Sequence, residues 1–143
     1  MKADKFVDKT YQNDFMKGVN KLRQNEEYTD VTLQSGDVQI RCHRIVLAVA
    51  SGYFKAMFKC GLKESTSDTV ELTLEPETLT SVVDYMYTGE IELTVDNVEN
   101  LVKACDVLQL DGPKSGCEDF IGCTSRLGQL CRIIQICSAV STA

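Results

Sequence analysis

One uninterrupted run of apolar residues limits the possible folds of this chain more than any other feature. Residues 45–50 (Ile-Val-Leu-Ala-Val-Ala) include no polar side chain, so a helix formed by them is expected to be buried on every side. Phe54, Met57 and Phe58 then recur at three- and four-residue spacing, which predicts one apolar face of a second helix. Ser51-Gly52 predicts the break between the two helices. The stretch therefore predicts a helical hairpin in the core of a compact domain.

The flanking segments predict a small sheet and further helices. Alternating apolar residues predict strands at 30–34, 38–42 and 70–74, with a short fourth strand at 90–93. The first two strands are joined through Gly36 and are expected to form a β-hairpin. Apolar periodicity predicts a helix over residues 11–23.

Residues that favour helix starts and ends set the limits of the remaining predicted helices. Pro76 is suited to a first helical turn and Gly89 to a C-cap, which predicts a helix between them. Asp96 and Glu99 have the spacing of an acidic capping box before the next helix. Gly112-Pro113 is expected to separate that helix from a last one. The predicted architecture is α+β, with helices gathered around a small sheet.

Composition and charge narrow the classes of partner. A chain of 143 residues is expected to form one domain. The formal net charge of −6, with scattered basic residues, argues against nucleic acid or an anionic membrane as the partner. No apolar run approaches the length of a transmembrane helix, and the polar N-terminus does not resemble a signal peptide. We expect no membrane association and a cytoplasmic or nuclear location.

The seven cysteines favour neither disulfides nor zinc. Their number is odd, no CxxC pair occurs, and His43 is the one histidine. We expect buried thiols and no cofactor or metal, with a redox-sensing cysteine as the open alternative.

No catalytic residues are predicted. His43 borders an apolar run, where a structural role is the expected one, and the chain has no GxSxG elbow or P-loop. The sequence therefore favours a protein-binding module over an enzyme.

Several short motifs, taken in order, carry a family resemblance. They are Tyr28-Thr29-Asp30-Val31, Cys42-His43-Arg44, Tyr53-Phe54-Lys55-Ala56-Met57-Phe58 and Tyr85-Met86-Tyr87-Thr88-Gly89. With the predicted order of elements, they resemble the BTB (POZ) domain, and residues 97–101 and 108–110 resemble its Kelch-like subfamily. The resemblance runs over residues 6–121. It implies an α+β BTB/POZ fold, in which a small, mainly three-stranded sheet is flanked by a cluster of five to six helices.

The C-terminal part departs from the Kelch-like pattern. Pro113 stands where relatives usually have an apolar residue, and residues 122–129 lack the proline and asparagine that lead into the helical extension called the 3-box and BACK region. We therefore divide the chain into a BTB/POZ domain at residues 1–121 and a divergent or truncated tail at 122–143, a remnant of the 3-box. Either a module cut from a longer protein or a truncated product is expected.

The resemblance also implies two interaction sites. The first is a homodimer contact through the N-terminal segment and the first helix, with exchange of N-terminal strands; its expected residues are Phe6, Val7, Phe15, Val19, Leu22, Asp30 and Arg44. The alternative, that this apolar stripe covers the domain's own core, stays open. The second is a contact for a cullin N-terminal domain, with Leu62 and Glu64 in a hydrophobic-x-Glu motif and Tyr87 beside it.

Two functions follow from this resemblance. The favoured one is the substrate-adaptor BTB domain of a cullin-RING ubiquitin ligase, with cullin binding weakened by the degenerate 3-box. The alternative is the dimerising, corepressor-recruiting module of a transcription regulator.

Overall fold

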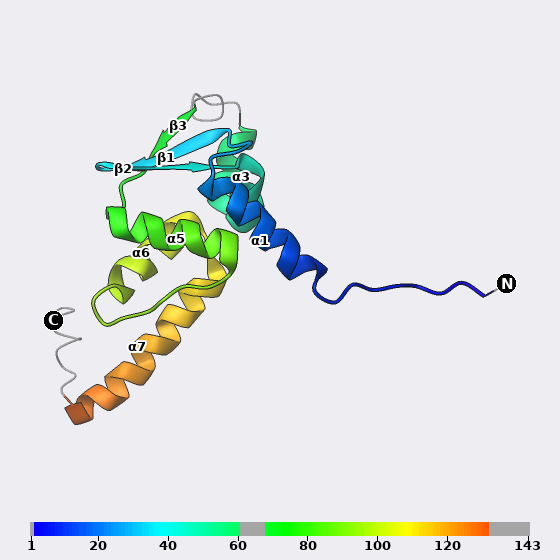
Figure 1. The fold of residues 1–143 in the computed structure, drawn as a ribbon. Coiled ribbons are helices and arrows are strands. Elements are labelled where there is room, and N and C mark those ends of the chain that lie inside the picture. Colours follow the sequence, from blue (N-terminus) through cyan, green and yellow to red (C-terminus); the bar gives the residue numbers. More distant parts are fainter. Residues whose placement is uncertain (1, 61–67, 132–143) are drawn as a thin grey trace.

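A three-stranded sheet and six helices make up the described part of the chain in a computed structural model, which covers residues 2–60 and 68–131, with side chains through residue 123 (Figure 1). The predicted α+β class and the size of the sheet are confirmed. The elements in chain order are α1 (Tyr11–Gln24), β1 (Val31–Ser35), β2 (Val38–Cys42), α2 (Arg44–Ala50), α3 (Gly52–Lys59), β3 (Thr69–Glu71), α5 (Pro76–Thr88), α6 (Val98–Leu108) and α7 (Asp111–Cys131).

The sheet has the order β2-β1-β3, with β1 in the middle. The predicted hairpin is present: β1 and β2 pair antiparallel, and Gly36 turns between them with φ +59°. β3 pairs with β1 in parallel and is shorter than predicted. Residues 90–93 pair with no other strand in the described part of the chain, so the predicted fourth strand does not form there.

The helical hairpin is confirmed, but the prediction that α2 is buried on every side is wrong. Only Leu47 of α2 is fully buried, whereas Ile45 is 73% and Val49 84% exposed. α2 packs against α3 and α5 on one side, and its other side lies at the molecular surface. An apolar run without a polar face is thus left half uncovered in a single chain.

The core lies between the sheet, the helical hairpin and the pair α5 and α6 (Figure 1). α5 begins at Pro76 and ends at Thr88, and Gly89 forms the predicted C-cap with a left-handed φ of +77°. The capping box of Asp96 and Glu99 is not formed. Asn97 occupies the N-cap of α6 instead, and it exchanges side chain–backbone hydrogen bonds with Thr94.

α7 begins one residue before Gly112, so the dipeptide Gly112-Pro113 lies in the first turn of that helix rather than before it. A proline is tolerated there because the first amides of a helix have no intrahelical acceptor. α7 runs without interruption across residue 121, the boundary predicted for the domain, and that division remains a prediction. None of the described helices is long and apolar enough to cross a membrane.

α1 is the least embedded helix. None of its fourteen residues is fully buried, although it carries a regular apolar stripe. Ahead of it, the N-terminal segment extends away from the rest of the molecule (Figure 1).

Candidate protein-interaction site

An apolar groove of about 460 Å³ opens between α1 and α2. From α1 it is lined by Phe15, Met16, Val19 and Leu22, and from α2 by Ile45, Val46, Val49 and Ala50. Tyr28, His43 and Met86 complete the lining. The exposed faces of both helices therefore meet in one surface, which we call the α1–α2 groove.

Several large apolar side chains that line the α1–α2 groove are exposed to solvent. Phe15 is 55% exposed, Tyr28 85%, Ile45 73% and Val49 84%. Scattered exposed apolar residues are normal on a protein surface, whereas a contiguous apolar patch marks an interaction site. The predicted residues Phe15, Val19 and Leu22 all line this groove, so the structure brings them together.

The C-terminal end of α1 is fixed to α5 by one arginine. Arg23 donates from Nη2 to Oδ1 of Asp84 at 2.9 Å, and its Nε and Nη2 donate to Oδ1 of Asn20. Its guanidinium also lies 4.8 Å from the centre of the Tyr87 ring, a cation–π contact. α1 is thus held at one end, while Phe15 on its N-terminal half stays largely exposed.

Asp30 and Arg44, two of the predicted dimer residues, are joined by hydrogen bonds at the start of α2. Asp30 Oδ1 accepts the backbone N–H of Arg44 at 2.7 Å, and Arg44 Nε donates to the backbone carbonyl of Asp30 at 3.2 Å. A carboxylate at a helix N-terminus is favoured by the helix dipole and satisfies a free amide. The guanidinium of Arg44 lies 5.0 Å from the centre of the Phe58 ring.

The remaining predicted dimer residues lie in the extended N-terminal segment. Phe6 is 86% and Val7 60% exposed. Neither lines the α1–α2 groove of its own chain.

Tyr87, predicted to contact a partner, has almost no surface to offer, because it is only 1% exposed. Its hydroxyl accepts the backbone N–H of His43 at 2.8 Å and lies 2.8 Å from the ring Nδ1 of the same histidine. Burial raises the pKa of Tyr87 far above its ordinary value, so this hydroxyl keeps its proton. Leu62 and Glu64, the other residues of the predicted cullin contact, lie outside the described residues.

His43 is arranged as a structural residue. It is 7% exposed, and its Nε2 lies 2.9 Å from the carbonyl oxygen of Glu27. A carbonyl can only accept, so Nε2 carries a proton, and in the neutral ring Nδ1 then accepts from the Tyr87 hydroxyl. Both ring nitrogens are therefore committed to hydrogen bonds inside the fold.

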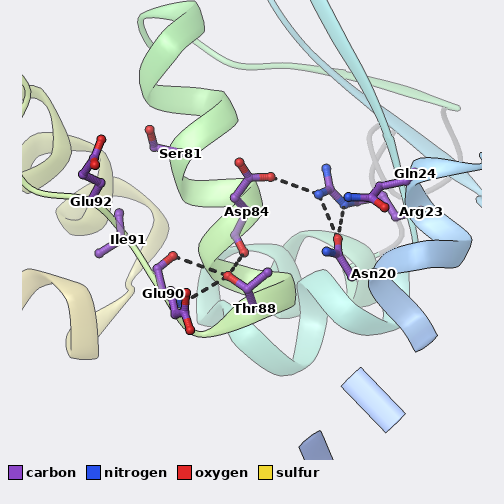
Figure 2. A pocket seen from close by; sticks show the side chains of 9 residues that line it. All are labelled: Asn20, Arg23, Gln24, Ser81, Asp84, Thr88, Glu90, Ile91 and Glu92. Carbon is purple, nitrogen blue, oxygen red and sulfur yellow. Dashed lines mark hydrogen bonds and ion pairs between the residues drawn. The ribbon is translucent and has the colours of Figure 1, made fainter. Parts of the chain in front are cut away.

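A second, polar hollow of about 590 Å³ lies between α1, α5 and the segment after α5 (Figure 2). Figure 2 shows the Arg23–Asp84 ion pair on one wall and Thr88 donating to the Asp84 backbone carbonyl. Its lining includes no histidine or cysteine. Among the described residues, no three His, Cys, Asp or Glu side chains gather to hold a metal ion.

The described cysteines are free thiols, of which Cys42, Cys105 and Cys117 are buried and Cys60 and Cys123 exposed. Burial raises the pKa of Cys42 and of Cys105 to about 12. Such thiols are protonated and inert near neutral pH, as expected of small core residues.

Comparisons with known proteins agree with this geometry. The family model described as BTB/POZ domain matches residues 19–125. The BTB domain of zebrafish PATZ1 superposes with a TM-score of 0.77 at 22% identity, covering 84% of this chain and 98% of that one. The BTB domain of human gigaxonin superposes with a TM-score of 0.73 at 21% identity, with the same coverage.

Curated relatives include Kelch-like proteins. Kelch-like protein 25 of Homo sapiens is 42% identical over 105 residues, which are 72% of this chain and 18% of the relative. Kelch-like protein 21 of Danio rerio is 39% identical over 117 residues, which are 81% of this chain and 19% of the relative. The chain thus spans about a fifth of the length of these relatives.

Fold and groove together define a protein-interaction module. The chain belongs to the BTB/POZ domain family.

Proposed function

We propose that this chain is a homodimeric BTB module that serves as the substrate-adaptor domain of a cullin-RING ubiquitin ligase. The observation that carries the homodimer is the α1–α2 groove, whose rim exposes Phe15, Ile45 and Val49 to water in a single chain. Covering such a surface is favourable by about 25 cal/mol for each Å² of apolar area removed from water.

A second copy is the occupant that fits the groove. The same chain carries an open apolar groove and an N-terminal segment whose Phe6 and Val7 have no apolar cover. In a dimer with two-fold symmetry, the groove and the N-terminal segment each take part twice, because residues of one copy contact complementary residues of the other. Asp30 and Arg44, expected in the same contact, are joined to each other by hydrogen bonds at the start of α2. A stable homodimer of this kind buries on the order of 2,000 Å² or more.

Sedimentation at micromolar protein tests the homodimer. We expect the wild type to sediment at twice the chain mass and Val49→Lys as a monomer, because the lysine would bring a charge into the covered groove. Val49 is 84% exposed in a single chain, so this substitution leaves folding intact. Val107→Lys is the matched control, since Val107 is a 53% exposed valine on α6 that does not line the groove. A monomeric wild type, or a dimeric Val49→Lys, would contradict the proposal.

Relatedness to Kelch-like proteins supports the adaptor role over the alternative of a transcription regulator. The proposed cullin contact is the Leu62 and Glu64 motif. An apolar anchor is the kind of residue that becomes a hot spot when a partner covers it, and a carboxylate adds a charge-assisted bond. Because Tyr87 is buried, we leave it out of the proposed contact.

Calorimetry against a cullin N-terminal domain tests the adaptor role. We expect micromolar binding, about 8 kcal/mol, weakened at least tenfold by Leu62→Ala and by Glu64→Ala. Glu92→Ala is the control, because Glu92 lines the separate polar hollow. If the wild type gives no heat at tens of micromolar, or if both motif variants bind the cullin domain as tightly as the wild type does, the adaptor role is wrong. The regulator role then becomes the better hypothesis.

A further inference from the structure

The turn between α1 and β1 holds its backbone in an unusual conformation. Glu26 has φ +55° and Tyr28 φ +60°, so two residues out of three adopt the left-handed region without being glycine. Side chains other than glycine are disfavoured there, and such a conformation persists only where surrounding contacts impose it.

The first of these residues ends α1 in a regular way. The N–H of Glu27 bonds the carbonyl of Leu22 at 2.8 Å, and the N–H of Glu26 bonds that of Arg23 at 2.9 Å. This is the Schellman pattern, in which a left-handed residue satisfies the last carbonyls of a helix. It accounts for Glu26 but not for Tyr28.

Tyr28, the second residue with a positive φ, is next to a peptide that is held by a contact from outside the turn. The carbonyl of Glu27, directly before Tyr28, accepts the Nε2 proton of His43 at 2.9 Å. His43 is fixed in turn, because Tyr87 bonds both its backbone N–H and its Nδ1. The chain of contacts therefore runs from buried Tyr87 on α5, through His43, to the peptide that sets the direction of Tyr28.

Tyr28 is placed on the dimer surface by this arrangement. Its ring lines the α1–α2 groove and is 85% exposed. Aromatic side chains with a polar tip are enriched among interface hot spots, since they bury much area at a low entropic cost. The sequence motifs gave no sign of this role.

We propose that Tyr28 is an anchor residue of the homodimer and that His43 is its positioning residue. This inference rests on the proposed homodimer. The second copy covers the Tyr28 ring, and the His43–Glu27 hydrogen bond keeps the strained turn in the conformation that presents it.

The histidine tautomer tests the hydrogen bond without any substitution. His43 is the one histidine of the chain, so its ring nitrogens are assigned at once in a long-range ¹H–¹⁵N correlation spectrum. We expect a protonated Nε2 and an unprotonated Nδ1 at neutral pH. The opposite tautomer would overturn the positioning role of His43.

Subunit exchange tests the anchor. Labelled and unlabelled dimers are mixed, and the appearance of mixed dimers is followed by native mass spectrometry. We expect Tyr28→Ala and His43→Leu each to speed exchange at least tenfold, and the double variant to exceed the faster single variant by less than threefold. His43→Gln keeps a donor for the Glu27 carbonyl and should lie closer to wild type than to His43→Leu. Val107→Ala, outside the groove, should exchange like wild type.

The outcomes separate this inference from the proposed homodimer. A monomeric wild type would overturn both. A dimeric wild type whose exchange is unchanged by Tyr28→Ala would overturn the anchor alone. Full additivity of Tyr28→Ala and His43→Leu, or a His43→Gln variant as fast as His43→Leu, would show that His43 acts on the fold in general and not through Tyr28.

Discussion

Ser51, at the break between α2 and α3, is the residue whose loss we expect to be most informative about stability. It is 1% exposed, and its hydroxyl makes two hydrogen bonds. Oγ accepts the N–H of Phe54 at 3.3 Å as the N-cap of α3, and it donates to the carbonyl of Leu108 at 2.6 Å. Leu108 is the last residue of α6, where carbonyls lack a partner within the helix.

The magnitude for Ser51→Ala follows from these two bonds. Loss of an N-cap costs about 0.5–2 kcal/mol, and a buried carbonyl left without a donor costs about 1–3 kcal/mol. We expect the free energy of unfolding to fall by about 1.5–5 kcal/mol. For a chain of this size that lowers Tm by roughly 5–15 °C.

Two further variants separate the contributions. Glycine caps a helix nearly as well as serine, so Ser51→Gly should lose mainly the Leu108 bond, about 1–3 kcal/mol. Thr80→Ala is the control, since its hydroxyl bonds a carbonyl at an exposed site on α5 where water replaces it. All variants are unfolded with urea at one protomer concentration, because dimerisation makes stability concentration-dependent. A loss under about 1 kcal/mol in Ser51→Ala would refute the reasoning.

Three further predictions concern single positions. The pKa of the Cys42 thiol is raised by burial to about 12, against an ordinary 9.0. The thiol of the unfolded chain therefore loses its proton first. The contribution of Cys42 to the free energy of unfolding is full below pH 9.0 and falls as the pH rises towards 12. Cys42→Ala should make this slope shallower by about 1.4 kcal/mol per pH unit, as measured by urea unfolding at several alkaline pH values; an unchanged slope would contradict the burial argument. Gly89→Ala forces an alanine to φ +77° and should cost about 1–2 kcal/mol, with Gly89→Asn costing less; equal Tm values for the three proteins would contradict it. Gly116→Ala, inside α7 with no atom within 4 Å of the added Cβ, should instead stabilise by about 0.5–1 kcal/mol in thermal unfolding, and a loss would show an unseen constraint.

Local signals predicted the elements that depend on local chemistry. Pro76 and Gly89 marked both ends of α5, and Ser51-Gly52 marked the break in the helical hairpin. These residues act through their own backbone geometry, which tertiary contacts reinforce.

Predictions that depended on distant contacts were less successful. α2 was predicted to be fully buried because an apolar run gives no information about whether the same chain or another one covers it. The capping box failed because Asn97, with Thr94 as its partner, occupies the N-cap of α6. Tyr87 was predicted at a surface, but its hydroxyl is needed inside by His43, a contact between residues far apart in the sequence.

For the dimer site, Phe15, Val19 and Leu22 were predictable as one helical stripe. Ile45 and Val49 were missed because their apolar run was interpreted as core. Tyr28 was missed because the positive φ of a residue other than glycine leaves no pattern in the sequence.

The parallel pairing of β1 with β3 has a consequence for the order in which the chain folds. β1 and β2 are joined by a tight turn and meet early, whereas β3 reaches β1 only after the whole helical hairpin has been passed. Closing such a long loop is entropically unfavourable until the hairpin helices have compacted. We therefore expect substitutions in the β1–β2 turn to slow folding, and substitutions at buried Val70 of β3 mainly to accelerate unfolding. We then expect β3, which pairs last during folding, to be the first strand to separate from the sheet during unfolding.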